Sequence, residues 1–467
     1  MGLDRLETLS VILESVGQAG VCLDGVEIRG SDPVLATRFR LGEAAAVALA
    51  GCGVLAAECW RERTGRSQGV RVDVPAAAAS LLSFLFQRVD GRDALRPGDR
   101  QGITDFYATR DARWVLVHGG FPHLQQGILD LLGVASRDPA PRREVGEAIA
   151  DWTAPALEDA IAERRLCGAM VRSQSEWSAH PQGRALRRVP VVEVLRVADS
   201  PPEPFESGGA RPLSGVRVLD LTRVLAGPTC ARTLAEHGAE VLKINSPKLP
   251  SVPQFVTDTG HGKRSAHLHL RERSDADCLR ALVTQADVFS QGYRSGALDR
   301  LGFDMQTLHA LRPGLVHTSI NCYGHAGPWA ERAGWEQLAQ TVTGIAEENG
   351  GERPRLLPAA ATDYTTGYLA ALGTLAALVR RAVVGGSYAV RVSLCRTGMW
   401  LQDLGRTAGP GAGLSKPMLA PLLISSDTPQ GRLEHLRPVV RLSETAARWE
   451  RPTVPLGSHD AAWEPRP

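Results

Sequence analysis

Apolar runs alternate with helical patterns along much of the chain, and this order predicts a parallel α/β fold. The run GVRVLDL at residues 215–221 predicts a buried strand, and AEVLKIN at residues 239–245 predicts the next one. Between them a helical pattern runs through Cys230 and ends at Gly238, a residue suited to a left-handed helix cap. A strand–loop–helix–strand order is typical of a right-handed βαβ unit. The connecting loop lacks GxGxxG, so a dinucleotide is not indicated, but a helix N-terminus behind small residues suits an anionic ligand.

Two Ala-rich segments align without gaps, residues 43–74 with residues 363–394. Each predicts a buried helix, a basic last turn, a Gly turn and a short strand, which reads VRVDV in the first segment and VRVSL in the second. Two unrelated Ala-rich helices could match by chance, but the shared turn and strand argue against that alternative. We therefore expect two partial copies of one structural unit.

The region between the two copies predicts a small α/β domain. Alternating residues at Ile103 to Val117 indicate a hairpin that turns at Arg110-Asp111, and helical patterns follow. The expected organisation is a partial large-domain repeat at 1–99, the small α/β domain at 100–199, a linker at 200–212, a Rossmann-like domain at 213–404 and an extended C-terminal tail at 405–467, whose Pro, Gly and Arg residues leave few helix or strand signals.

Composition narrows the possible partners. The chain has 467 residues, a net charge of +2, 43% apolar and 22% charged residues, which is typical of a globular protein. This balance gives no case for nucleic acid or a membrane surface. The longest apolar run, residues 44–57, is too short for a bilayer and predicts a buried helix. The N-terminus lacks a secretory pattern, and the eight Cys show no CxxC spacing, so we expect a cytoplasmic protein without disulfides or metal.

Asp363 stands just before the Ala-rich helix of the second copy, where the first copy has Glu43. A single Asp there is most simply a helix N-cap. The positive end of the helix dipole would keep such a carboxylate ionised. An ionised carboxylate in a dry pocket can also attack a thioester carbonyl, so the two interpretations stay open together.

Four short segments combine Gly with charged or aromatic residues where strands are expected to end. Ligands of open parallel sheets bind at the carboxyl ends of strands, and basic residues there can hold phosphates. Ordinary turns with solvated charges are the alternative. The segments are GHGKRS at 260–265, QGYRSG at 291–296, YGHAGP at 323–328 and GWE at 334–336.

The order of these motifs resembles family III CoA transferases, the formyl-CoA and carnitine CoA transferase group, which shares its fold with α-methylacyl-CoA racemases. The resemblance covers about residues 212–395 and includes PLSGVRVLDLTRVLAGP, ADVFSQGYRSGALDRLGF and TDYTTGYLAALGTLAALVRR. Residues 40–76 and 100–185 resemble later parts of the same family. The resemblance therefore implies a Rossmann-like parallel-sheet large domain plus a small α/β domain, in a fused and permuted arrangement. It also implies that residues 213–404 are the CoA-binding catalytic domain.

The same resemblance implies residue roles. Asp363 falls on the nucleophilic aspartate, which forms an acyl anhydride and then an aspartyl-CoA thioester, and Glu336 falls on an active-site glutamate. CoA and acyl-CoA are then substrates, no cofactor is permanently bound, and a homodimer is expected. The implied CoA-binding residues are Arg223, Leu225, Ala226, Lys263, Arg264, Tyr293, Arg294, Tyr323, Gly324 and His325.

Some positions depart from the family pattern. Leu225 stands where some transferases have glutamine, and Asn245 replaces an acidic strand end. Trp335 replaces the histidine of the racemases, which removes one of the two bases that racemization needs. The Gly-rich loop that covers the intermediate in some members has no clear match. Two alternatives to CoA transfer therefore stay open: a CoA-thioester-binding protein without transferase activity, and a racemase or epimerase.

Overall fold

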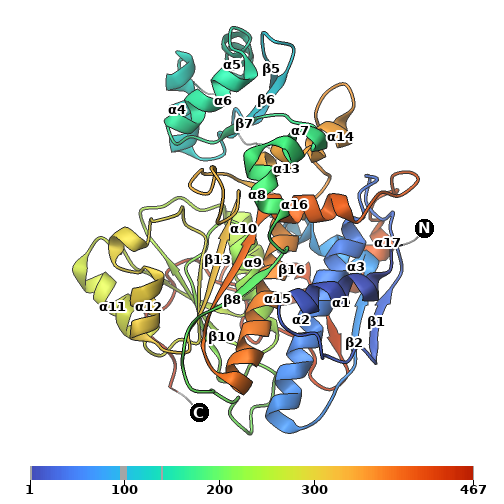
Figure 1. Cartoon of the computed structure of the whole chain (residues 1–467), viewed down its shortest axis with the longest axis vertical. Helices are drawn as coiled ribbons and strands as arrows, with labels where there is room; N and C mark the ends of the chain where they lie inside the picture. Colours follow the sequence, from blue (N-terminus) through green and yellow to red (C-terminus); the bar gives the residue numbers. More distant parts are fainter. Residues whose placement is uncertain (1–2, 95–101, 138–139, 466–467) are drawn as a thin grey trace.

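A seven-stranded sheet forms the centre of the protein and confirms the predicted α/β fold (Figure 1). The computed structural model describes residues 3–94, 102–137 and 140–465. Six strands are parallel, and β8 lies antiparallel at one edge, beside β14. Across the sheet the strands are β11 (Lys263–His267), β10 (Glu240–Asn245), β9 (Arg217–Asp220), β12 (Val288–Gln291), β13 (Val316–Asn321), β14 (Ser387–Ser393) and β8 (Glu193–Ala198).

Both faces of this sheet are covered by helices. Val218 of β9 belongs to one hydrophobic core and its neighbour Leu219 to another, as expected for a strand buried on both faces. The helices divide accordingly: α9 (Ala226–Glu236) and α15 (Ala361–Val384) pack in the first core, whereas α11 (Arg273–Val283) and α12 (Met305–Leu311) pack in the second (Figure 1).

The two aligned segments fold alike. The segment 43–74 forms most of α2 (Leu41–Thr64) and β2 (Val70–Asp73), as its counterpart forms α15 and β14. Beside β2 lie the parallel strand β1 (Val26–Arg29) and the antiparallel strand β17 (Arg441–Leu442), which complete a three-stranded sheet. Helices α1 (Arg5–Ser15) and α3 (Val74–Ser80) pack on α2.

Helices α2 and α15 pack directly against each other (Figure 1). A Cβ atom on Gly51 would collide with the side chain of Leu372, and the Cys52 thiol donates to the Tyr368 carbonyl at 3.2 Å. Small side chains therefore allow the two backbones to approach closely. Both helices are long and apolar enough to cross a membrane, but most of each lies inside the protein, as in core helices.

The predicted small α/β module contains a three-stranded sheet and three helices (Figure 1). The predicted hairpin is confirmed, with its turn between β5 and β6. The elements of this small unit are β5 (Asp105–Ala108), β6 (Trp114–Val117), α4 (Pro122–Leu132), α5 (Arg142–Ile149), α6 (Ala154–Glu163) and β7 (Gly168–Met170).

Residues at the end of the expected small domain instead join the rest of the molecule. Helices α7 (Gln174–Ala179) and α8 (Pro181–Arg187) lead to β8, which pairs with β14 in the large sheet. The interval 100–199 thus contributes the antiparallel edge strand of that sheet, and the exact domain limits stay a prediction.

The C-terminal region is more regular than its Pro- and Gly-rich composition suggested. After α16 (Leu394–Asp403) and the short α17 (Lys416–Leu419), a hairpin of β15 (Leu423–Thr428) and β16 (Gly431–Leu436) pairs with β3 (Arg88–Val89). β3 in turn pairs with β4 (Arg92–Asp93). The expected extended tail thus includes a regular hairpin at residues 423–436, which forms because a partner strand is available at Arg88–Val89.

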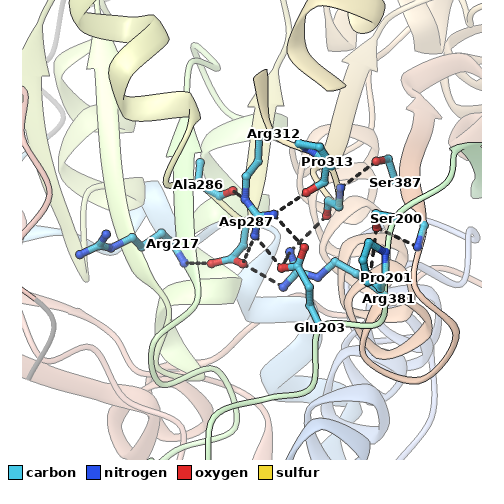
Figure 2. A network of polar contacts seen from close by, with 12 residues as sticks. Ser200, Pro201, Glu203, Arg217, Ala286, Asp287, Arg312, Pro313, Arg381 and Ser387 are labelled. Atoms are coloured by element: carbon cyan, nitrogen blue, oxygen red, sulfur yellow. Dashed lines mark hydrogen bonds and ion pairs between the residues drawn. The ribbon is translucent and has the colours of Figure 1, made fainter. Parts of the chain in front are cut away.

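A buried polar network fixes the linker below the amino ends of the central strands (Figure 2). Asp287 accepts from the Arg381 guanidinium at 2.9 Å and from the backbone N–H of Arg217 at 2.8 Å. Glu203 of the linker forms two hydrogen bonds with Arg312, at 2.8 and 2.6 Å. The network therefore joins the linker, the start of β9 and the end of α15.

We expect Asp287→Asn to lower the free energy of unfolding by about 3 kcal/mol, measured by urea denaturation. The substitution keeps the volume but leaves the Arg381 guanidinium, which is 4% exposed, without its closest counter-charge. Asp199→Asn is the matched control, because Asp199 pairs with Arg196 at the surface and its loss should be almost silent. Equal effects of the two variants would contradict a role for the network in stability.

Candidate active site

Asp363 lies in the first turn of α15, but it does not cap this helix. Ala360 occupies the N-cap position and offers no side-chain acceptor. Glu336, the first residue of α13 (Glu336–Thr343), accepts from the backbone N–H groups of Thr362 at 3.0 Å and of Asp363 at 2.5 Å. The N-cap alternative for Asp363 is therefore wrong, and its carboxylate is not used to cap the helix.

The two carboxyl groups form a close pair of like charges. Burial raises the pKa of Asp363 well above its usual range, and the charge of Glu336 raises it further. Burial also raises the pKa of Glu336, while hydrogen bonds from the two backbone N–H groups and from Gln340 (2.6 Å) favour its ionised form. Ionising one member therefore makes it harder to ionise the other.

The Asp363 side chain is half-buried and accepts no hydrogen bond within the described ranges of the chain. This is unusual for a carboxyl group in the first turn of a long buried helix, where N–H groups and counter-charges are common partners. A raised pKa beside an identified charged neighbour is a physical mark of a functional group. The geometry thus leaves Asp363 free to react with a ligand.

The small unit supplies one wall near this pair. The His118 ring stacks on the Trp335 ring with centroids 5.6 Å apart, and the Phe121 ring lies 5.2 Å from it. Arg223 of the large domain lies over Phe121, 5.9 Å from the ring centroid. The Cys322 thiol contacts the Trp335 carbonyl oxygen at 3.7 Å. Burial raises the pKa of this thiol, and the nearby charge of Asp363 contributes to the rise.

The loop after β9 is held by a buried group of charges. Asp220 accepts from the backbone N–H of Thr222 at 3.0 Å and pairs with Lys263 at 2.9 Å and Lys243 at 3.5 Å. Lys263 also donates to the Pro228 carbonyl at 2.7 Å. Burial lowers the pKa of Lys243 to about 8. Lys263 thus holds the loop in place, and it lines a small cavity there together with Lys243.

This loop brings its small residues against α15. Leu225 is buried at the N-cap of α9, and Ala226 is the first residue of that helix. A Cβ atom on Gly367 would lie 2.5 Å from the Ala226 carbonyl oxygen, so the two helices meet one turn after Asp363. Arg223 lines the same small cavity as Lys263 and donates to the Pro250 carbonyl.

Two larger cavities meet at the loop after β12. Arg294 lines a polar cavity of about 440 Å³, whereas its neighbour Tyr293 lines a mainly apolar cavity of about 430 Å³. Tyr323 also lines the polar cavity. Four arginines surround the polar cavity, and the apolar one is closed by leucines. These residues are Arg165, Arg294, Arg300 and Arg332 for the first, and Leu221, Leu249, Leu268, Leu270, Leu298 and Leu301 for the second.

Gly324 and His325 shape the turn after β13. Gly324 has a φ of 93°, and its N–H and carbonyl are both bonded to the Asn321 side chain, at 2.7 and 3.0 Å. The His325 ring lies 2.9 Å from the Ser319 hydroxyl, and burial lowers the pKa of His325 to about 4. Both residues thus position the backbone next to Tyr323.

The structure does not bring Arg264 to this group. Its guanidinium donates to the Ala462 carbonyl at 2.6 Å and lies 3.8 Å from Glu464, so the C-terminal residues bind it. It lines a separate cavity near the amino ends of the strands. Neighbouring residues of a strand point to opposite faces, which explains why Lys263 and Arg264 separate.

Sequence patterns alone missed several residues near the site. His118, Phe121 and Cys322 lie around Trp335, and Arg300 lines the polar cavity. The segment His118-Gly119-Gly120-Phe121 directly after a predicted strand could have signalled a close backbone approach. Cys322 carried no such signal, since a buried Cys is most often a small core residue.

Comparison with known proteins agrees with the arrangement of these residues. The family model described as CoA-transferase family III matches residues 15–198 and 213–411, which is most of the chain. The chain belongs to this family. The resemblance stated from the motifs is thereby confirmed, and both partial copies fall inside the matched ranges.

Family III relatives with curated names match over long segments. An acetyl-coenzyme A transferase of Hypoxylon pulicicidum is 34% identical over 343 residues, 69% of this chain and 58% of that protein. A formyl-CoA:oxalate CoA-transferase of Rhodopseudomonas palustris is 33% identical over 39% of this chain and 46% of that protein. The chain thus spans about half the length of the curated relatives that it matches.

Among solved structures, a CaiB/BaiF family protein of Brucella suis is 30% identical over 48% of this chain and 65% of that chain. Its TM-score is 0.39, so this overlap adds nothing to the fold assignment.

We expect Gly367→Ala to lower the free energy of unfolding by about 1–3 kcal/mol, because the new methyl group would press on the Ala226 carbonyl. Thermal or urea unfolding measures this change. Gly409→Ala is the control, since that position has open space and an ordinary φ. If the two variants unfold alike, the close approach of α9 and α15 is not as described.

Proposed function

We propose that this protein transfers coenzyme A between carboxylic acids, with Asp363 as the nucleophile. The observation that carries the proposal is the Asp363 carboxyl group, which is unbonded within the described residues, next to Glu336 at the start of a buried helix. The names of the relatives support the same reaction class, since those proteins are called acetyl-CoA, acyl-CoA and formyl-CoA transferases.

The two cavities beside β12 suit the two chemical parts of CoA. The apolar cavity of Tyr293 would take the adenine ring, and the arginine-lined cavity would take phosphate groups. Arg165, Arg294 and Arg300 form no ion pair with any described carboxylate, so their charges are available to an anion. Arg223, Lys243 and Lys263 add positive charge around the small cavity beside the loop after β9. We therefore retain all the predicted CoA-binding residues except Arg264.

The chemistry follows from a carboxylate nucleophile. An Asp363 oxygen attacks the carbonyl carbon of the acyl-CoA, the C–S bond breaks, and CoA leaves as a thiolate, which gives an aspartyl acyl anhydride. The thiolate then attacks the aspartyl carbonyl and releases the first acid as a carboxylate. This gives an aspartyl-CoA thioester. The acceptor carboxylate repeats the two steps in reverse order, and Asp363 is regenerated.

The surroundings of Asp363 support these steps. Glu336 holds the first turn of α15 in place, which fixes the direction of the attacking carboxylate. The rings of Trp335, His118 and Phe121 exclude water from one side, which protects an anhydride from hydrolysis. The proposal places this reaction in the cytoplasm, where the protein would meet acyl-CoA.

We expect Asp363→Asn to lower the rate of CoA transfer roughly 10⁴-fold or more, because an amide cannot attack a thioester. Incubation of the wild type with acetyl-CoA, formyl-CoA or succinyl-CoA and hydroxylamine should give a hydroxamate at Asp363, detected by peptide mass spectrometry. The variant should give none and should still bind CoA with unchanged affinity in calorimetry.

The two alternatives predict different results. A CoA-thioester-binding protein without transferase activity would bind CoA but form no adduct with any donor. A racemase would exchange the α-proton of an acyl-CoA with deuterium from the solvent, and Trp335 in place of a base disfavours that reaction.

Glu336→Gln should move the acid limb of the pH profile of kcat/KM to lower pH. Attack requires ionised Asp363, whose pKa is raised, so activity falls as pH drops through that pKa. Removing the charge of Glu336 removes one cause of the rise, so Asp363 stays ionised at lower pH. Glu347→Gln, at an exposed position, is the control and should leave the profile unchanged. An acid limb that stays in place or moves upward would contradict electrostatic coupling of the pair.

A further inference from the structure

The two copies of the repeat correspond strand by strand. Val70 of β2 pairs with Val26 on one side and Leu442 on the other. Its aligned residue, Val390 of β14, pairs with Thr318 of β13 and Val194 of β8. In both sheets the first neighbour is parallel and the second antiparallel. The sheet β1-β2-β17 is therefore a small version of the edge β13-β14-β8.

The copies contact each other through their equivalent helices. α2 and α15 have the same length, 24 residues, and they pack at their middles, where Gly51 meets Leu372 and Cys52 bonds to Tyr368. The same surface of each copy thus forms the contact, as in an interface between two identical subunits related by a two-fold axis.

Each copy also has a buried carboxyl group below the start of its long helix. Asp32 accepts from the backbone N–H of Glu43 at 2.8 Å, as Glu336 accepts from that of Asp363 at 2.5 Å. Burial raises the pKa of Asp32, as it does that of Glu336. Asp32 and Glu43 are therefore the counterparts of Glu336 and Asp363.

The second members of the two pairs have different surroundings. The Glu43 carboxylate is 2% exposed and is held by Arg40 at 2.8 Å and Arg5 at 3.3 Å. Asp363 is half-buried and has no cation within ion-pair distance among the described residues. Two guanidinium groups neutralise Glu43 and occupy its lone pairs, so it cannot serve as a nucleophile.

The covering segments differ as well. The small unit follows the first copy along the chain, yet its residues His118 and Phe121 contact Trp335 beside Asp363. After α16 of the second copy, residues 407–413 bond instead to the backbone of residues 34–38. These bonds join Thr407 to Arg38, Gly411 to Leu35 and Gly413 to Val34, each at 2.9 Å. Residues 407–413 thus pack on the segment just before α2, whereas the small unit packs beside the other pair.

We infer that the chain is an internal dimer of two unequal copies, with one open carboxylate centre at Asp363 and a second, closed centre at Asp32 and Glu43. The protein accordingly works as a single chain, and not as the homodimer that the family resemblance implied. The surface that would join two subunits is already used inside the chain, between α2 and α15. The inference on assembly and on the closed centre does not require that CoA be transferred.

The test compares Glu43→Gln with Asp363→Asn in the full chain. Glu43→Gln should lower Tm by about 5 °C or more, because Arg5 and Arg40 lose their shared counter-charge. Asp363→Asn should leave Tm unchanged or raise it, since it removes a buried like charge beside Glu336. Light scattering should give the mass of one chain, 50.0 kDa, for the wild type and both variants.

If Glu43→Gln fails to fold, Arg5→Met should still lower Tm, because it removes the longer ion pair of Glu43 and the hydrogen bond from Arg5 to the Gly30 carbonyl. Equal Tm changes for the Glu43 and Asp363 variants, or a mass of two chains at micromolar concentration, would overturn the inference. Hydroxylamine labelling should be confined to Asp363, and a label on Glu43 would overturn it as well. Absence of any label would count against CoA transfer alone, because the melting and mass measurements do not depend on it.

Discussion

The close contact of α2 with α15 is the constraint on which the other parts of the structure depend. Gly51 of α2 faces the Leu372 side chain of α15 with no room for a Cβ atom, and α15 meets α9 just as closely, where Gly367 lies against the Ala226 carbonyl. Packing at this density leaves no room for the helices to slide. Because α15 is held between α2, α9 and the sheet, its first turn is fixed, and the position of Asp363 is fixed with it.

Several charges buried around this contact have a partner of opposite sign. Asp220 has Lys243 and Lys263, Asp287 has Arg381, and Arg232 lies 2.8 Å from Asp258. A buried charge without a partner is strongly destabilising, so such pairs are expected. At the start of α15, Glu336 and Asp363 meet instead as two acids. The protein tolerates this repulsion at the place where a ligand would bring its own chemistry.

The parallel sheet, the hairpin of the small unit and the two long helices could be predicted, because each leaves a periodic pattern in a short stretch of sequence. The order of the motifs singles out Asp363, whereas local patterns alone would have assigned this residue to a helix N-cap. The actual cap, Glu336, could not be derived from local signals, because its N–H partners lie far along the chain.

Other features of the structure also depend on contacts between distant residues, so local sequence patterns do not predict them. The contact of His118 with Trp335 depends on how the small unit sits on the large sheet, which no local pattern encodes. The hairpin at 423–436 depends on a short partner strand, Arg88–Val89, whose polar residues give no strand signal by themselves. The resemblance implies that Arg264 and Lys263 bind the same ligand, although the pleat turns neighbouring side chains apart.

The linker at residues 200–212 has a consequence beyond holding Glu203 against Arg312. Covalent connection makes the pairing of the two copies independent of protein concentration, so dilution cannot separate them. It also means that the two copies need not have the same sequence. In an assembly of two identical chains, every mutation appears twice, and a change that closes one centre closes both. Within one chain, each copy can diverge alone, so arginines could gather around Glu43 while Asp363 kept its open position.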